Sequence, residues 1–171
     1  MGKAGCGKDT VADYLVARHS FVKFRLAQAI EDLCRDEYGM KEKNRELMIR
    51  VGEAYKKKYG QDYWLRIVAS RLGKPGIGRV VVSDVRFPYE YEYFDANGFI
   101  PVRIVCSSRR RIARLANRDG NPQLAALTDP TEQQVDDLPS GYQIDNSGTL
   151  QELYDEVDIL VELMAGREGL F

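Results

Sequence analysis

Three short apolar runs, rich in β-branched residues, stand out along the chain, and each predicts a strand. The clearest is Arg-Val-Val-Val-Ser-Asp at 79–84, which follows the turn-rich segment 73–78. Such a run is typical of a strand buried on both faces of a parallel sheet. The other two are 100–106 and 142–145. Segments with apolar residues at helical spacing alternate with these runs, and they predict helices at about 9–19, 87–97, 108–117 and 149–165. Strands that alternate with helices indicate an α/β fold with a mainly parallel sheet flanked by helices.

The segment 27–71 follows a different pattern and contains no convincing strand. Its apolar spacing predicts three helices, at about 27–38, 44–58 and 62–71. We therefore expect a helical insertion, 27–75, between the two halves of the sheet. A chain of 171 residues is long enough for one substantial core, so we expect a single domain. Within this domain we expect a central α/β part made of 1–26, 76–106 and 139–171, and a separate arginine-rich lid made of 107–138.

A glycine-rich motif occupies the N-terminal residues. Gly-Lys-Ala-Gly-Cys-Gly-Lys-Asp-Thr at 2–10 fits the P-loop pattern G-x-x-x-x-G-K and leads into a predicted helix. Glycines let backbone N–H groups turn around a phosphate, and the helix N-terminus adds its dipole. Lys8 can then reach the β- and γ-phosphates of a nucleoside triphosphate. The alternative is a plain glycine-rich turn, but the additional Gly5 and the helical pattern favour a phosphate cradle.

This motif departs from the general pattern in two ways. Asp9 stands where Ser or Thr usually contacts Mg²⁺, and Thr10 follows one place later. Both carry oxygen atoms, which hard cations prefer as ligands. In addition, no buried strand precedes the loop in this sequence. A sheet without that strand has an open edge, and open edges pair with other chains. We therefore expect either a homodimer or another element in the gap.

Two charged residues follow the strand predicted at 79–84. Asp84 comes at its C-terminal end, where ligands bind in open α/β sheets, and Arg86 is two residues further on. We expect Asp84 to bind Mg²⁺ or substrate, while a helix-capping acid is the alternative. In the insertion, Arg45 is a candidate for binding a second anion. Trp64 could stack on a base, although a core position explains it equally well.

Arginines gather in the segment 108–118, which has no carboxylate before Asp119. They are Arg109, Arg110, Arg111, Arg114 and Arg118. Guanidinium groups suit bidentate capture of phosphate oxygens. Arg110 and Arg114 are four residues apart and share one helix face, so we expect them to close over a transferring phosphoryl group. A solvated surface helix is the alternative.

Composition excludes several other classes of protein. The formal net charge of −1 argues against a general nucleic-acid binder, and no apolar stretch is long enough to span a membrane. The chain has 3 cysteines and 1 histidine, and their spacing suits neither a disulfide framework nor a structural zinc site. We therefore expect a reduced chain in the cytoplasm, with small-molecule nucleotides as partners.

Several segments together resemble the phage deoxynucleoside monophosphate kinase family. The most specific are Gly-Lys-Asp-Thr at 7–10, Asp-Val-Arg-Phe-Pro at 84–88 and Asn-Ser-Gly-Thr-Leu at 146–150. Arg-Glu-Leu at 45–47, Gly52 and Asp-Tyr-Trp at 62–64 are also similar, so the resemblance runs through nearly the whole chain. Animal phosphomevalonate kinase looks similar in the same places, as a more distant relative. Dephospho-coenzyme A kinase shares the Asn-x-Gly stretch.

The resemblance implies a kinase that uses ATP and Mg²⁺, in the host cytoplasm if a phage encodes it. Transferred by position, the ATP-binding residues are Gly2, Gly5, Cys6, Gly7, Lys8, Asp9, Thr10, Arg110, Asn146 and Gly148. The acceptor-binding residues are Arg45, Trp64, Asp84 and Arg86, and the metal-binding residues are Asp9, Thr10 and Asp84. The residues that act on the transferring group are Lys8, Arg86, Arg110 and Arg114.

The acceptor of such a kinase is itself an ionised phosphate, so no general base is required. Catalysis would then consist of positioning and charge stabilisation. Three alternatives remain open. The acceptor could be another small phosphate such as phosphomevalonate, the chain could bind nucleotide without catalysis, or the arginine-rich helix could bind nucleic acid.

Overall fold

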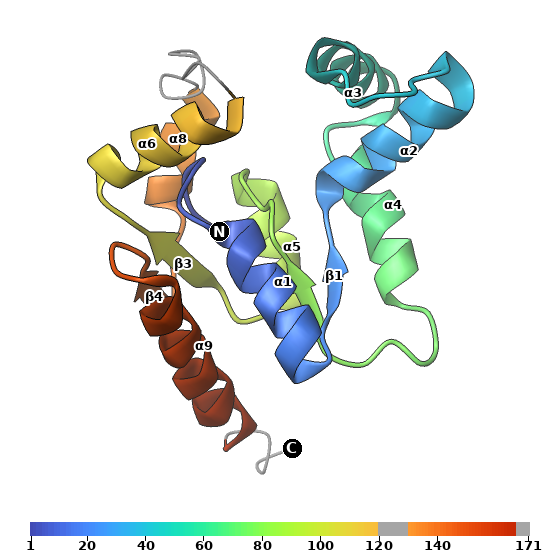
Figure 1. Cartoon of the computed structure of the whole chain (residues 1–171). Helices are drawn as coiled ribbons and strands as arrows, with labels where there is room; N and C mark the ends of the chain where they lie inside the picture. Colours follow the sequence, from blue (N-terminus) through green and yellow to red (C-terminus); the bar gives the residue numbers. More distant parts are fainter. Residues whose placement is uncertain (120–129, 167–171) are drawn as a thin grey trace. The chain divides into compact units, whose positions relative to one another are not determined.

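The computed structural model describes residues 1–119 and 130–166 (Figure 1). Strands and helices alternate through most of this part of the chain. In order they are α1 (Lys8–His19), β1 (Val22–Phe24), α2 (Leu26–Tyr38), α3 (Arg45–Tyr59), α4 (Tyr63–Leu72), β2 (Val80–Val82), α5 (Pro88–Ala96), β3 (Val102–Val105), α6 (Ser108–Asp119), α8 (Pro130–Asp137), β4 (Tyr142–Asp145) and α9 (Leu150–Ala165). The α/β class, and the strands and helices expected from the hydrophobic pattern, are confirmed.

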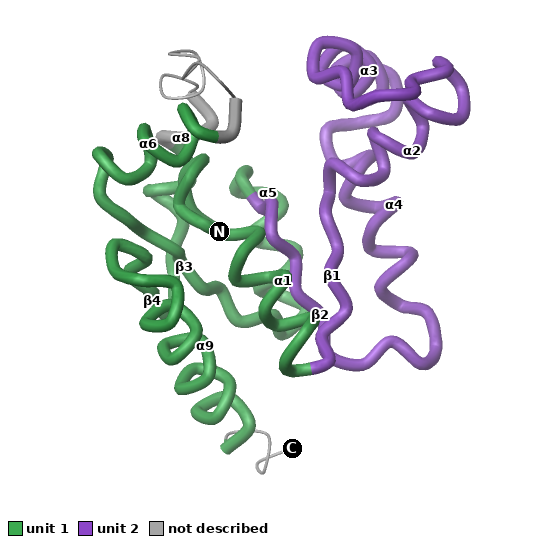
Figure 2. The backbone as a smooth tube through the Cα atoms, viewed as in Figure 1, with its two compact units in different colours: residues 1–19, 86–171 green, residues 20–85 purple. Residues whose placement is uncertain are grey.

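The chain divides into two compact units, coloured separately in Figure 2. Unit 1 comprises 1–19 and 86–171, and unit 2 comprises 20–85. Each unit has its own parallel strand pair, β3 with β4 in unit 1 and β1 with β2 in unit 2. The predicted subdivision into core, insertion and lid stays a prediction, and residues 120–129 of that lid lie outside the described part of the chain.

Unit 1 is built around β3 and β4, which run parallel with Val102 opposite Tyr142 and Val105 opposite Asp145. Helices α1 and α9 pack on each other, and the fully buried Leu153 and Val157 of α9 lie in one core cluster with the strand residue Ile104. Cys6 of the glycine-rich loop belongs to the same cluster. The loop is therefore anchored in the core of this unit.

Met1 pairs with strand β3 through two backbone hydrogen bonds. The Met1 nitrogen donates to the Val102 carbonyl at 2.8 Å, and the Ile104 nitrogen donates to the Met1 carbonyl at 2.9 Å. This pair of bonds is the parallel pattern, on the edge of β3 opposite β4. Only one residue is paired in this way, so the described residues before α1 form no regular strand.

Unit 2 contains the helices α2, α3 and α4, which pack on one another, and the β1–β2 pair, in which Val22 lies opposite Val80 and Phe24 opposite Val82. Asp84, just after β2, accepts from the backbone nitrogens of Leu26 at 2.7 Å and Ala27 at 2.9 Å. These are free N–H groups of the first turn of α2. Asp84 therefore caps a helix, but it caps α2 rather than the helix that follows it in sequence.

Two elements, β1 and α8, were not predicted from the sequence. Strand β1 is only three residues long and is partly exposed, so it has no continuous apolar run. Helix α8 has the polar sequence Pro-Thr-Glu-Gln-Gln-Val-Asp-Asp, and of the side chains described in it Val135 is buried, as is Leu138 just after it. Hydrophobic periodicity is too weak over such short segments to indicate them.

Candidate functional site

The loop before α1 has the backbone conformation of a phosphate cradle. Gly2, Gly5 and Gly7 all have positive φ angles, of 142°, 80° and 94°. A Cβ atom at Gly2 would lie 2.2 Å from the Ile104 carbonyl oxygen, and one at Gly7 would lie 2.2 Å from Nδ2 of Asn146. Only glycine fits these positions, because L-residues avoid this φ region and the space is already taken. The residues present therefore fit a group held by backbone N–H groups at a helix N-terminus.

Asn146, directly after β4, braces this loop from the side. Its side chain is buried, and its Nδ2 donates to the Cys6 carbonyl at 2.8 Å. Its Oδ1 and its own carbonyl both accept from Nη2 of Arg114, each at 3.1 Å. The hydrogen bonds from Arg114 to Asn146 and from Asn146 to Cys6 thus link α6 to the loop. Nη1 of Arg114 is buried and has no hydrogen-bond partner among the described residues.

Two further arginines of α6 contact the same region. Nε of the buried Arg111 donates to the Ala4 carbonyl at 3.0 Å. The exposed Arg110 donates through Nη1 to the Gly148 carbonyl at 2.8 Å. In this structure the arginines of α6 therefore hold the backbone of the loop and of the turn after β4. The proposed closing movement stays a prediction, and the side chain of Arg118 lies outside the described residues.

Lys8, the first residue of α1, turns back toward the loop that precedes it. Its Nζ donates to the Lys3 carbonyl at 3.0 Å, and Lys3 in turn forms an ion pair with Asp136 of α8. Asp9 is exposed and Thr10 is half-buried at the same helix start. Both lie within the first turn of α1, where an Mg²⁺ ion held with a triphosphate would find oxygen ligands. Among the described residues, no group of three or more His, Cys, Asp or Glu side chains could hold a metal unaided.

The predicted acceptor residues are divided between the units. Arg45 is exposed at the first turn of α3 in unit 2. Trp64 is 5% exposed, its indole N–H donates to the Gly52 carbonyl at 3.1 Å, and its ring contacts Tyr55 and Tyr63. A base could stack on this ring only after the aromatic cluster had opened. Arg86 belongs to unit 1, where its backbone nitrogen donates to Glu90 at 2.8 Å.

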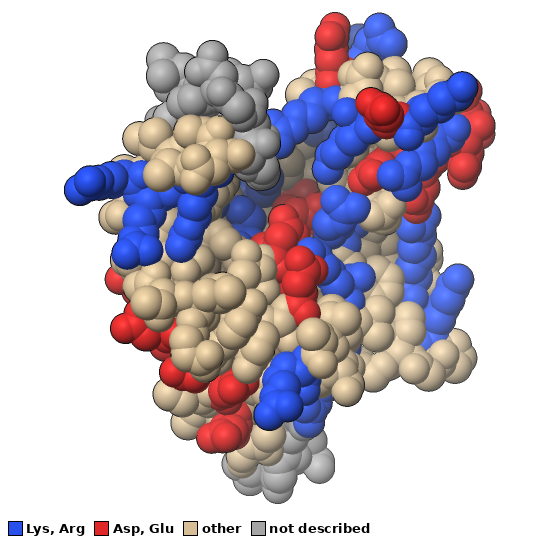
Figure 3. All heavy atoms as spheres, viewed as in Figure 1, with Lys and Arg blue, Asp and Glu red and all other residues tan. Residues whose placement is uncertain are grey.

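Positive charge gathers beside α6, as the blue spheres of Figure 3 show. One carboxyl group is affected directly: hydrogen bonds from the backbone and the hydroxyl of Thr149 hold the pKa of Glu152 below its ordinary value, and Arg110 adds to this. The pKa of a nearby thiol is shifted mainly by burial, against the effect of the arginines. Burial, with Cys6 nearby, raises the pKa of Cys106 to about 11.

Comparison with protein families matches residues 1–135 to the model described as AAA domain. The chain belongs to the AAA domain family. No curated protein matches the sequence. Solved structures resemble this AAA domain at low identity. TT1252 from Thermus thermophilus superposes with a TM-score of 0.62 at 18% identity, covering 95% of this chain and 94% of that one. Shikimate kinase from Acinetobacter baumannii, solved with shikimate, gives a TM-score of 0.56 at 17% identity over 97% and 90% of the two chains. The P-loop kinase-like α/β fold is thereby confirmed.

No helix in the described part of the chain is long and apolar enough to cross a membrane.

Some residues contact the glycine-rich loop although the sequence did not predict it. Arg111 was predicted only as one of the lid arginines and Cys106 was given no part in the site, yet both contact the loop. Asn146 was expected to contact ATP but not to brace the loop. The available signal was position, because Cys106 and Asn146 each come directly after a parallel strand, and such strand ends meet at one edge of the sheet.

Proposed function

We propose that this chain transfers the γ-phosphoryl group of ATP to the phosphate of a (deoxy)nucleoside monophosphate, giving the diphosphate. The observation that carries the proposal is the glycine loop at the start of α1, braced by Asn146 and Arg111. Such a loop offers an anion the backbone N–H groups and the helix dipole in a fixed arrangement. Its fit to a phosphate supports the donor half of the reaction.

Side chains around the loop supply the charge that phosphoryl transfer requires. Lys8 is bonded to the Lys3 carbonyl, a contact that a negatively charged phosphate oxygen would replace with a stronger, charge-assisted one. Nη1 of Arg114 is a buried donor without a partner in the described residues, so an incoming anion would gain a hydrogen bond there. Mg²⁺, held by Asp9 or Thr10 together with the phosphates, would neutralise charge on their oxygens.

The acceptor half rests on the sequence segments that resemble deoxynucleoside monophosphate kinases. Asp84 holds the start of α2 through two backbone nitrogens, so its carboxylate is fixed in orientation. A carboxylate has about four lone-pair sites, so a carboxylate held in this way can also bind substrate or metal. The resemblance assigns Arg45 to binding of the monophosphate and Arg86 to the acceptor side, and guanidinium groups suit both roles. An acceptor that is already ionised needs no base, which agrees with a chain that has 1 histidine.

A second candidate is a kinase of another small phosphate, such as phosphomevalonate. The burial of Trp64 favours it, because a nucleotide acceptor was expected to use this ring for stacking. An ATP-consumption assay with each of the four deoxynucleoside monophosphates, and with phosphomevalonate, separates the two. Turnover with a nucleotide supports the proposal, and turnover with phosphomevalonate alone selects the second candidate. Tight ATP binding without turnover on any acceptor would contradict both.

A further inference from the structure

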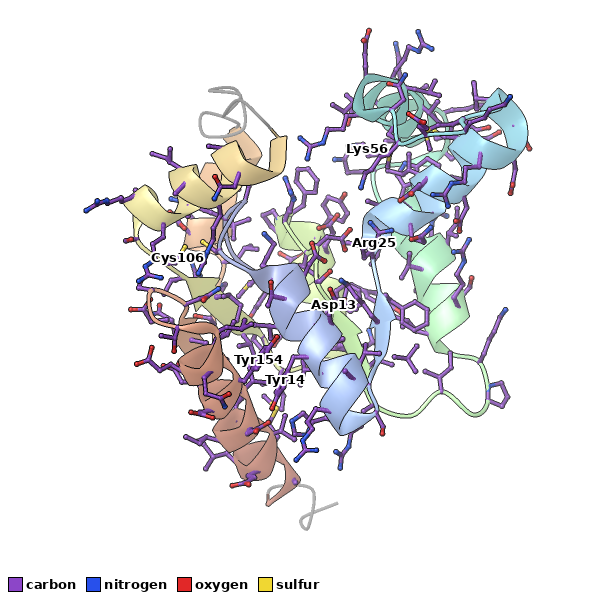
Figure 4. The ribbon with its side chains drawn as sticks, viewed as in Figure 1. Asp13, Tyr14, Arg25, Lys56, Cys106 and Tyr154 are labelled. Atoms are coloured by element: carbon purple, nitrogen blue, oxygen red, sulfur yellow. The ribbon has the colours of Figure 1, made fainter. Side chains whose placement is uncertain are left out.

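Two thiols meet behind the phosphate-binding loop. Cys6 lies between Gly5 and Gly7, and its sulfur is 3.6 Å from the sulfur of Cys106, at the end of β3. Cys106 also lies 3.9 Å from the Gly5 carbonyl oxygen. Figure 4 shows Cys106 just beyond β3, below α6. Neither residue is in a disulfide in this structure, and the two come from segments 100 residues apart.

The two sulfurs are close enough to bond after a small movement. A disulfide requires a separation of about 2.05 Å, so the sulfurs would have to approach by roughly 1.5 Å. Cys6 is 3% exposed, whereas Cys106 is half-buried, so a small oxidant reaches Cys106 first. We propose that Cys6 and Cys106 form a reversible oxidation site, at which a hydroperoxide joins the two thiols in a disulfide that weakens the binding of a triphosphate to the loop.

The chemistry takes two steps and balances with the hydroperoxide as the only oxidant. The Cys106 thiol first gives its proton to solvent. Its thiolate attacks the terminal oxygen of the hydroperoxide, so an S–O bond forms and the O–O bond breaks. The alkoxide, or hydroxide from hydrogen peroxide, leaves and takes up a proton from solvent to become an alcohol or water. Cys106 is then a sulfenic acid, oxidised by two electrons. The sulfur of Cys6 displaces the hydroxyl group of the Cys106 sulfenic acid, and the S–S bond forms. The Cys6 proton leaves with the hydroxide as water.

The thiolate is the reacting form, and its abundance sets the rate. Burial beside Cys6 raises the pKa of Cys106 to about 11, while the nearby Arg111 and Arg114 of α6 act against this rise. Oxidation should therefore be slow at neutral pH and faster in mildly alkaline buffer. The pair would respond to sustained exposure to peroxide rather than to brief pulses.

The disulfide should act on the loop because the loop has little freedom to adapt. Gly5 and Gly7, on either side of Cys6, already have positive φ angles, and the Cys6 carbonyl is held by Asn146. Movement of Cys6 toward β3 therefore shifts the N–H groups that face the phosphates. This effect rests on the proposed nucleotide site, whereas formation of the disulfide does not. By linkage, bound ATP must then favour the dithiol by the same factor.

The experiment treats the full chain with hydrogen peroxide in mildly alkaline buffer and follows two readouts. Mass spectrometry of the digested protein should find a Cys6–Cys106 disulfide that dithiothreitol removes. Calorimetry should show ATP affinity at least about tenfold weaker in the oxidised protein. A tenfold change also predicts that saturating ATP raises the reduction potential of the pair by about 30 mV in a glutathione buffer, because ATP stabilises the reduced form.

Matched variants separate this site from general oxidation. Cys106→Ser should abolish both the disulfide and the loss of affinity, whereas Cys34→Ser, at a buried cysteine of unit 2, should retain both. Circular dichroism checks that the oxidised protein remains folded. Over-oxidation of Cys106 without a disulfide would overturn the proposal, as would a disulfide that leaves ATP affinity within twofold. If the reduced protein fails to bind ATP, the proposed function falls and the effect on ATP with it, while the disulfide is still judged by mass spectrometry.

Discussion

Replacement of Asn146 by alanine tests whether the contact between β4 and the loop organises the phosphate site. The change removes the only described donor to the buried Cys6 carbonyl, at 2.8 Å, and one of two acceptors for Nη2 of Arg114. A buried polar group left without its partner costs about 1–3 kcal/mol, and a hydrogen bond to a charged group contributes about 1.5–3 kcal/mol. Because Arg114 keeps the main-chain carbonyl, we expect a total loss of roughly 2–4 kcal/mol in the free energy of unfolding.

Urea denaturation followed by circular dichroism measures this loss, and Asn97→Ala is the matched control. Asn97 also donates through Nδ2 to a backbone carbonyl, that of Tyr93 at 2.7 Å, but the bond is exposed. It should cost less than about 1 kcal/mol. If the Asn146→Ala variant loses only about 1.4 kcal/mol of binding free energy for ATP, its ATP affinity falls about tenfold. If the Asn146→Ala protein kept the stability and ATP affinity of the unmodified chain, Asn146 would not be needed to hold the loop in place.

Three further predictions concern catalysis, metal and pH. Lys8→Ala should lower turnover by on the order of a thousandfold with the fold intact, because it removes charge that stabilises the transition state; near-normal steady-state rates would contradict this. Activity should require a divalent cation, and Asp84→Asn should reduce kcat far more than Asp155→Asn on the exposed face of α9; full activity in excess chelator would rule out the magnesium model. Hydrogen bonds from His19, at 2.6 Å, and then from Tyr14 hold the pKa of Asp158 below its ordinary value. The unfolded chain therefore takes up this proton at higher pH than the folded chain, so the free energy of unfolding should fall as pH drops from about 4 through the lowered pKa. Asp158→Asn should flatten that slope in acid titrations, and an unchanged slope would exclude the contact.

The Asp158 contact belongs to a larger junction between α1 and α9 that the sequence does not indicate. Figure 4 shows Tyr14 and Tyr154 facing each other there, and their rings stack with centroids 3.9 Å apart. Tyr14 and Asp158 are 144 residues apart in sequence, so no local pattern relates them. What the pattern did predict was local: helices that begin near 87 and 149, where the structure has Pro88 at the first turn of α5 and a capping box of Thr149 and Glu152.

At the candidate site, too, the features set by neighbouring residues were predictable from the sequence, and the contacts between distant segments were not. A glycine motif depends on backbone conformation, which is set within a few residues, so 2–10 was recognisable as a cradle. The role of an arginine depends on which carbonyl lies opposite, and that follows from packing. The sequence therefore predicted a lid that contains Arg111 and Arg114, and it could not indicate their contacts with Ala4 and Asn146. Asp84 was ambiguous between ligand binding and capping, and here its carboxylate caps α2.

Phosphorus NMR of one reaction mixture tests the central claim most directly. The unmodified chain is incubated with ATP, Mg²⁺ and one deoxynucleoside monophosphate at a time, with Lys8→Ala as the matched control. The account predicts that, for at least one of the four bases, the monophosphate resonance is replaced by the two resonances of a nucleoside diphosphate as ADP accumulates, and that the control shows neither change. Formation of ADP and inorganic phosphate without any deoxynucleoside diphosphate, or no loss of ATP with all four acceptors, would contradict it.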